Sequence, residues 1–166
     1  SIRTSGLSRF EGDLTPGDAV RVISSKGDFL GIGVWNPSSQ ITGRIMTWID
    51  EPLNAEYWQR QITRSIDRRR WLALEPDTNG YRLVNAESDG MPGLVVDRFG
   101  DGVVVQIANA GMELLKDDIA AALQKVLKSK TILFKNNGKM RSSEELESYL
   151  EFAEGDSKEL EFEENG

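Results

Sequence analysis

The first fifty residues carry short runs of apolar and β-branched side chains, separated by clusters of turn-forming residues. The runs cover residues 19–23, 29–35 and 41–49. They are bounded by Pro16-Gly17-Asp18, by residues 25–28 and by residues 36–39, which are rich in Gly, Pro, Ser, Asn and Asp. Strands this short, joined by tight turns, favour a small barrel.

Residues 53–72 change to a helical period. Ala55, Trp58, Ile62 and Ile66 recur at spacings of three and four and form one apolar stripe. Asn54 is a suitable N-cap for this helix, and the turn-rich stretch at residues 76–80 ends it. That stretch also marks a domain boundary.

The second half predicts an α+β unit. Apolar runs indicate strands at 81–86, 94–99 and 103–108, then a helix from about 112 to 128 and a strand at 131–135. A further strand is expected near Leu150, and the alternation at 160–163 has strand period. The order does not give the strict alternation of a doubly wound sheet, so the fold class is α+β.

The net charge of −7 is unevenly distributed over the 166 residues. Residues 1–72 carry +2, residues 73–139 carry −1 and residues 140–166 carry −8. An acidic total argues against nucleic-acid binding, which depends on Lys and Arg. Because the acidity lies almost wholly at the C-terminal end, that objection does not apply to the first 139 residues.

The chain contains neither cysteine nor histidine. This composition excludes Ser-His and Cys-His triads, a thiolate nucleophile, disulfides and the usual zinc sites. The sequence also has no apolar run of about 20 residues, the length needed to cross a bilayer, so no membrane association is expected.

The segment 87–93 places Glu87 and Asp89 beside two glycines and a proline. Two carboxylates could bind a hard cation or perform acid–base chemistry. The alternative is a tight connection between strands, for which Asp-Gly and Pro-Gly supply the geometry. We favour the turn, because no third oxygen ligand accompanies the pair.

Arg60, Arg64 and Arg68 repeat every four residues along the predicted helix and form a candidate phosphate-binding stripe. The alternative is a solvated face partly neutralised by Glu56. Trp35 and Trp48 could stack on bases, although aromatic residues in small barrels are more often core. Further basic residues of the β region favour an RNA-facing side: Arg3, Arg9, Arg21, Lys26 and Arg44.

Two segments resemble a known family. The stretches 16–22, 27–33 and 36–41, followed by Arg44, look like a PUA domain, a small β pseudo-barrel. The string at 81–101, with Glu-Ser-Asp-Gly-Met-Pro-Gly-Leu-Val-Val-Asp-Arg at its centre, resembles the central segment of bacterial RlmI-like 23S rRNA 5-methylcytosine methyltransferases. The resemblance covers about residues 10–140.

The resemblance implies a PUA-like β pseudo-barrel, a connecting helix and then a β-β-α-β-β domain. On this basis we assign residues 1–52 to the PUA-like barrel, 53–75 to the connecting helix and 76–155 to the central domain. Residues 156–166 would lead into a C-terminal methyltransferase domain that the chain lacks.

The resemblance also implies a function in rRNA methylation. Members of the family use S-adenosylmethionine and a cysteine nucleophile, and this chain has neither the glycine-rich cofactor loop nor any cysteine. We therefore expect no catalytic, cofactor-binding or metal-binding residue, and an inactive chain. Its expected partners are ribosomal RNA and its own missing methyltransferase domain, in the cytoplasm, with a homodimer left open.

The expected RNA-binding residues combine the basic side chains with the polar loop of the barrel: Arg3, Arg9, Lys26, Asn36, Ser39, Gln40, Arg44, Arg60, Arg64 and Arg68. The alternative function is a non-catalytic protein-interaction or dimerisation module with an acidic C-terminal segment.

Overall fold

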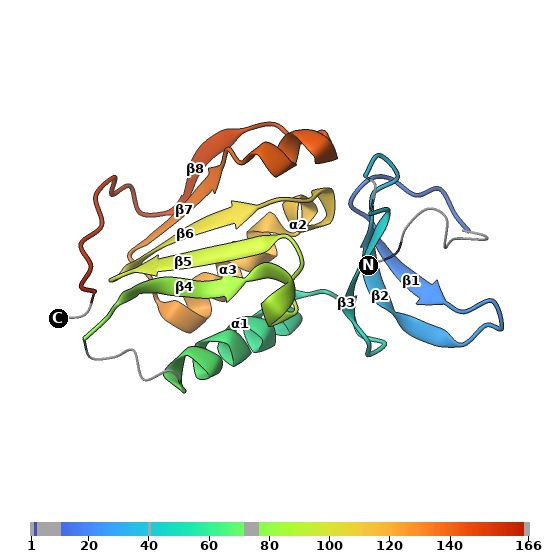
Figure 1. The fold of residues 1–166 in the computed structure, drawn as a ribbon, viewed down its shortest axis with the longest axis horizontal. Coiled ribbons are helices and arrows are strands. Elements are labelled where there is room, and N and C mark those ends of the chain that lie inside the picture. Colours follow the sequence, from blue (N-terminus) through green and yellow to red (C-terminus); the bar gives the residue numbers. More distant parts are fainter. Residues whose placement is uncertain (1, 3–10, 40, 72–76, 165–166) are drawn as a thin grey trace.

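The computed structural model describes residue 2 and residues 11–39, 41–71 and 77–164. Two sheets lie side by side, with the smaller one nearer the N-terminus (Figure 1). The elements follow in the order β1 (Ala19–Ile23), β2 (Phe29–Trp35), β3 (Gly43–Thr47), α1 (Ala55–Arg70), β4 (Gly80–Asn85), η2 (Ala86–Asp89), β5 (Leu94–Phe99), β6 (Gly102–Ile107), α2 (Ala110–Leu114), α3 (Lys116–Leu127), β7 (Thr131–Asn136), η3 (Lys139–Glu144) and β8 (Tyr149–Glu154).

The small sheet is an antiparallel meander of order β1-β2-β3. The predicted strands at 19–23 and 29–35 are confirmed, whereas the third strand is shorter than the predicted 41–49. Ile2 adds an antiparallel bridge to Gly43 at the start of β3. Residues 48 and 49 follow the end of β3, and their side chains are exposed.

The second sheet has the order β4-β5-β6-β7-β8. All neighbouring pairs are antiparallel except β6 and β7, which are parallel and are connected through α2 and α3. This mixed arrangement confirms the α+β class. The sheet has three strands before its helices, one more than the β-β-α-β-β order that the resemblance implied.

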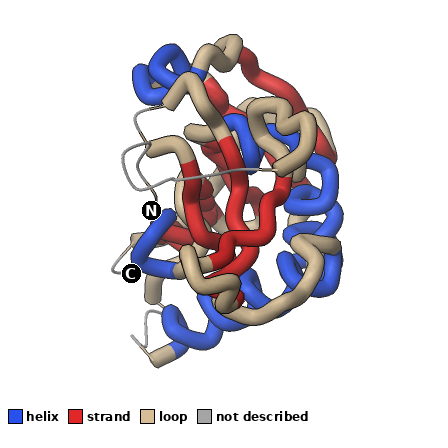
Figure 2. The backbone as a smooth tube through the Cα atoms, turned by 90° about the vertical axis from the view of Figure 1, so that its right-hand side faces the viewer, coloured by secondary structure: helices blue, strands red, loops and turns tan. Residues whose placement is uncertain are grey.

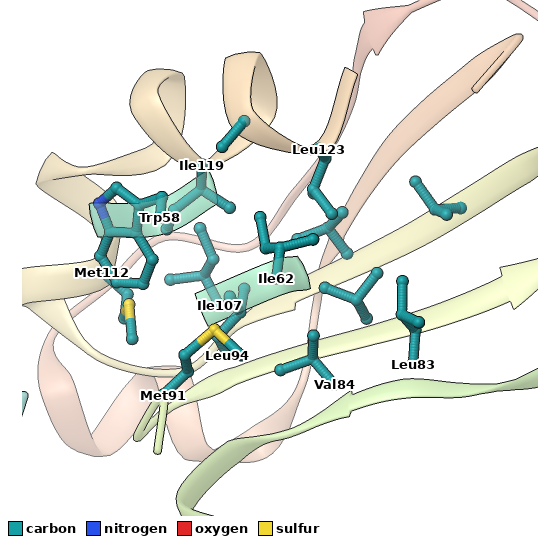
Figure 3. Packing of buried hydrophobic residues seen from close by; sticks show 14 of the residues in the cluster. Trp58, Ile62, Leu83, Val84, Met91, Leu94, Ile107, Met112, Ile119 and Leu123 are labelled. Atoms are coloured by element: carbon teal, nitrogen blue, oxygen red, sulfur yellow. The ribbon is translucent and has the colours of Figure 1, made fainter. Parts of the chain in front are cut away.

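Helices α1 and α3 pack against each other and against one face of the five-stranded sheet. Figure 3 shows the side chains of Trp58 and Ile62 from α1 meeting those of Ile119 and Leu123 from α3 above Leu94 of β5. These five side chains are fully buried. The helix at 55–70 is therefore part of the core of the larger sheet and does more than connect two domains.

The local sequence explains where α1 begins and ends. The Oδ1 of Asn54 accepts a hydrogen bond from the backbone N–H of Tyr57, as predicted for an N-cap. Arg68, Arg69 and Arg70 occupy the last turn, where positive charge is favourable near the negative end of the helix dipole.

The segment predicted as one helix from 112 to 128 forms two, α2 and α3, separated at Leu115. The helical structure begins earlier than the apolar period indicated, because Asn109 caps α2 by accepting a hydrogen bond from Met112 N–H. Gly111 lets α2 approach the small sheet closely, since a Cβ at this position would overlap the side chain of Val34 in β2. Figure 2, viewed from the side of the small sheet, shows most of the helical segments on one side of the strands.

The C-terminal segment does not form the strand suggested by the alternation at 160–163. It crosses the ends of β4 and β6, where Phe162 and Leu160 contact Gly80 and Gly102, so it cannot form a ladder with a sheet edge. Two hydrogen bonds between Asn79 and Glu163 hold it there.

Within the described ranges, no helix combines the length and apolarity required for a bilayer span.

Replacing Trp58 by Ala tests the core. Trp58 is fully buried, whereas Trp71 is 89% exposed at the end of α1. We expect Trp58→Ala to lower the free energy of unfolding by about 3–5 kcal/mol, as for other large core truncations. The matched Trp71→Ala variant should change it by less than about 0.5 kcal/mol. Urea unfolding of both variants measures the difference, and equal losses would contradict this packing.

Candidate nucleic-acid interface

A buried carboxylate holds the two sheets together. The side chain of Glu144, at the end of η3, is 3% exposed and forms an ion pair with Arg44 of β3 at 2.8 Å. Asn36 Nδ2 donates to its other oxygen at 2.7 Å. Burial alone would raise the pKa of Glu144, but hydrogen bonds from Ser39 and Asn36 and the charge of Arg44 lower the pKa below its usual value.

Three of the predicted RNA-binding residues, Asn36, Ser39 and Arg44, are thus brought together in the protein interior. Asn36 and Ser39 are buried, and the Arg44 side chain is 12% exposed. Their polar groups are directed at Glu144 and away from solvent. Their position gives them a role in joining the small sheet to η3.

Arg68 is also engaged within the protein. It donates to Asp89 Oδ1 at 3.0 Å, while Arg69 donates to both oxygens of Asp89 at 2.7 Å. Burial would raise the pKa of Asp89, but the hydrogen bonds from Arg69, Asn85 N–H and Arg68 lower it. The pair of arginines anchors the end of α1 to the connection between β4 and β5.

The same contacts show how the turn at residues 87–93 is built. Both carboxylate oxygens of Asp89 are taken by arginine and backbone donors. Gly90 and Gly93 adopt positive φ, which gives the tight connection its shape. Among the described residues, no group of three potential ligands of the Asp, Glu, His or Cys type could hold a metal ion.

Arg60 and Arg64 lie on the outer face of α1. Arg60 pairs with Glu51, and its side chain remains 46% exposed. Arg64 is exposed and forms no ion pair or hydrogen bond with another described residue. A shallow hollow of about 500 Å³ lies between them on the helix surface. Of the predicted stripe, these two arginines line the hollow, whereas Arg68, although its side chain is 55% exposed, is engaged by Asp89.

The connection between β3 and α1, whose Glu51 pairs with Arg60, carries exposed apolar side chains. Trp48 is 74% exposed and Ile49 is 64% exposed. Glu51 links this connection to α1, because it accepts a hydrogen bond from Thr47 and also pairs with Arg60. We call the group Arg21, Trp48, Ile49, Arg60 and Arg64 the Trp48 surface.

Arg21 completes the Trp48 surface from the side of β1. Its guanidinium pairs with Asp50 at 2.6 Å and lies 4.8 Å from the ring centre of Phe29. Both partners of this ion pair are more than half exposed, so the pair is weak and open to exchange for another anion. An exposed indole beside arginines is suited to stacking on a base while the arginines contact phosphates.

The other predicted residues lie apart from this surface or outside the described residues. Lys26 is exposed in the turn between β1 and β2. Trp35, the other aromatic residue considered for stacking, is 8% exposed and belongs to the core. Arg3, Arg9 and Gln40 lie outside the described residues.

Sequence reasoning missed Glu144 and Arg141. Arg141 is 3% exposed and donates to the carbonyl of Ile107, the carboxylate of Glu113 and the carbonyl of Glu147. Both residues lie in the segment that appeared as an acidic extension. Only contacts with residues about 100 positions earlier in the chain, among them Arg44 and Asn36, distinguish Glu144 from its solvated neighbours.

Comparison with known proteins agrees with the PUA-like assignment and with the central segment. Residues 2–48 match the PUA-like domain family. Over 147 residues the chain is 35% identical to ribosomal RNA large subunit methyltransferase I of Erwinia tasmaniensis, a match that covers 88% of this chain. The resemblance to RlmI-like proteins is confirmed. The chain spans 37% of the length of that relative.

Solved structures show that this chain shares its fold with parts of larger proteins. A candidate SAM-dependent methyltransferase from Streptococcus mutans superimposes with a TM-score of 0.73 at 22% identity, over 89% of this chain and 37% of the other. A second candidate methyltransferase, in complex with SAH, gives a TM-score of 0.72 at 23% identity, over 86% and 36% of the two chains.

Removing the charge of Glu144 tests the contact between the sheets. Glu144→Gln should lower the free energy of unfolding at neutral pH by roughly 3 kcal/mol, because Arg44 then stays buried without a charged partner. The neighbouring Glu145 is exposed. Glu145→Gln therefore serves as the matched control and should have little effect.

The pH dependence follows from the lowered pKa of Glu144. A carboxyl whose pKa is lower in the folded state stabilises the protein above its unfolded pKa of about 4.3 and loses that effect as the pH falls through the folded value. Urea unfolding as a function of pH should show a smaller acid loss in Glu144→Gln than in the native chain. Identical acid profiles would contradict the assignment.

Proposed function

We propose that the chain is the RNA-binding and substrate-positioning region of an S-adenosylmethionine-dependent rRNA (cytosine-C5) methyltransferase. The observation that carries this proposal is the match to ribosomal RNA large subunit methyltransferase I over 88% of the chain. The PUA-like match at residues 2–48 and the Trp48 surface support the RNA-binding part of this proposal.

The proposed RNA contacts lie on the Trp48 surface, which includes only some of the RNA-binding residues expected from the sequence. Arg60 and Arg64 line the hollow on α1, and Trp48 offers an exposed stacking face in the connection whose Glu51 pairs with Arg60. Lys26, exposed at the hairpin tip, stays a secondary candidate for phosphate contact. Asn36, Ser39 and Arg44 are excluded from the proposed surface, because their side chains are bound inside the protein. Arg68 is also left out, because its exposed side chain is paired with the buried Asp89.

In this proposal, catalysis takes place in a part of the enzyme outside these 166 residues. Methyl transfer to cytosine C5 requires a nucleophile that adds to C6, and the chain has no cysteine to supply a thiolate. The matched region is 37% of the relative from Erwinia tasmaniensis, which leaves room for a catalytic domain that binds S-adenosylmethionine. This chain would then position the RNA.

Filter binding of rRNA fragments at several salt concentrations tests the arginines. We expect Arg60→Ala/Arg64→Ala to weaken binding and to reduce the salt slope by roughly 1.4, since each lost single-strand phosphate contact removes about 0.7. Lys125→Ala/Lys158→Ala is the charge-matched control, because both lysines are exposed on other elements. Unchanged affinity and slope in the arginine variant would refute the Trp48 surface.

Trp48→Ala separates stacking from charge in the same assay. The substitution should cost about 1–3 kcal/mol of binding free energy, the usual contribution of one stacked base, without changing the salt slope. Trp71→Ala, which removes an exposed indole at the other end of α1, is the control. If no rRNA fragment binds the native chain and light scattering shows a stable oligomer, the interaction-module alternative is the better one.

The isolated chain allows a direct test of the proposed division between RNA positioning and catalysis. Titration calorimetry with S-adenosylmethionine should give no binding heat for this chain, and incubation with rRNA and labelled cofactor should transfer no methyl group. No binding is expected because the chain lacks the family's glycine-rich cofactor loop, and no transfer because it has no cysteine nucleophile. Cofactor binding or methyl transfer by the isolated chain would overturn the proposed division of roles.

A further inference from the structure

A separate pocket lies at the end of the five-stranded sheet that faces the small sheet. Its volume is about 260 Å³, and its lining comes from β5, β6, β7 and the connections η2 and η3. It belongs neither to the Trp48 surface nor to the Glu144 contact. Pockets outside the carboxyl ends of parallel strands are common ligand sites in α/β sheets, and β6 and β7 are the parallel pair of this sheet.

The pocket exists because β6 and β7 separate before they end. Their backbone pairing stops at Val105 and Phe134, and beyond it the side chain of Asn136 accepts a hydrogen bond from Ile107 N–H at 2.7 Å. Arg141 binds the carbonyl of Ile107 at 2.8 Å from the side of η3. These contacts hold the rim in place, so the pocket is formed without a ligand.

The floor of the pocket is a row of side chains across the sheet. Val95 of β5 pairs with Gln106 of β6. Gln106 and Lys135 directly follow Val105 and Phe134, the last residues at which β6 and β7 pair. Because side chains alternate along strands and Val96, Val105 and Phe134 are buried beneath the helices, this row lies on the opposite face. Glu87 and Lys139 line the pocket from η2 and η3.

Four polar side chains of the lining have no partner. Within the described part of the chain, Glu87, Gln106, Lys135 and Lys139 form no side-chain hydrogen bond or ion pair. Arg141, in contrast, is fully engaged with protein acceptors. The pocket therefore combines two ammonium groups, one carboxylate and one amide that are all available to a ligand.

We propose that this pocket binds a single nucleotide of the RNA, with its base over Val95 and Gln106 and its phosphate near Lys135 and Lys139. The volume is slightly below the roughly 300–1,000 Å³ of pockets for drug-sized ligands, which suits one base. Glu87 can accept a hydrogen bond from an exocyclic amino group, and the Gln106 amide can both donate and accept. This chemistry favours cytosine, adenine or guanine over uracil.

The proposal rests on the proposed RNA-binding function but involves different residues. RNA would contact the Trp48 surface through stacking and phosphates, whereas the pocket would take one unpaired nucleotide out of the strand. Loss of the first contact would leave the pocket itself intact. The two can therefore fail independently in one set of variants.

Amide NMR titrations of the native chain with CMP, UMP, cytidine and inorganic phosphate test the pocket. CMP should shift the Gln106 side-chain amide and the backbone amides of residues 135–139, and it should bind more tightly than UMP. Lys135→Ala/Lys139→Ala should weaken CMP binding about tenfold, the loss expected for one charged hydrogen bond, and leave cytidine binding unchanged. Glu87→Gln should remove the preference for CMP over UMP.

The controls separate this proposal from the RNA-binding function. Lys125→Ala/Lys158→Ala, Trp48→Ala and Arg60→Ala/Arg64→Ala should all bind CMP as the native chain does. No shift at Gln106 with CMP, or equal binding of phosphate alone, would overturn the pocket even if rRNA fragments bind. A single-stranded pentaribonucleotide that shifts the same amides at lower concentration than CMP supports an RNA nucleotide, and failure to compete with CMP overturns that assignment.

Discussion

The pairing of Glu144 with Arg44 and Asn36 is the constraint on which the arrangement of the two sheets depends. A carboxylate that is 3% exposed is stable only when its charge and its lone pairs are satisfied. Its partners come from the small sheet, while η3 follows β7 of the large sheet. The buried charge therefore fixes the position of the small sheet relative to the strands that form the pocket.

Periodicity predicted those parts of the fold that depend on local sequence. The strands at 19–23, 29–35 and 94–99 and the N-cap at Asn54 follow from residues within a few positions of each other. Periodicity predicted neither the break between α2 and α3 at Leu115 nor the irregular backbone at 160–163. Each depends on packing: α2 approaches β2 through Gly111, and the last segment crosses the ends of strands.

The same distinction explains how far the candidate site could be predicted. Arg60, Arg64 and Arg68 look equivalent in the sequence, because all three occupy one helical stripe. Only the structure shows that Arg68 differs, because its exposed side chain pairs with Asp89, 21 residues further along the chain. Similarly, Trp35 and Trp48 differ by strand pairing: one lies within β2, and the other follows the end of β3. Composition identifies candidate residues, whereas burial and ion pairs in the fold determine which of them a ligand can contact.

Gly111 lies at the contact between α2 and β2 and affects how the small sheet packs against the rest of the chain. A Cβ there would overlap Val34, so even alanine would act as a wedge between α2 and β2. Neither the Trp48 surface nor the pocket contains this residue. A change at position 111 would therefore alter the angle between the small sheet and the sheet that carries the pocket, and leave the side chains of both places unchanged. The size of one side chain would then set how the two sheets are oriented relative to each other.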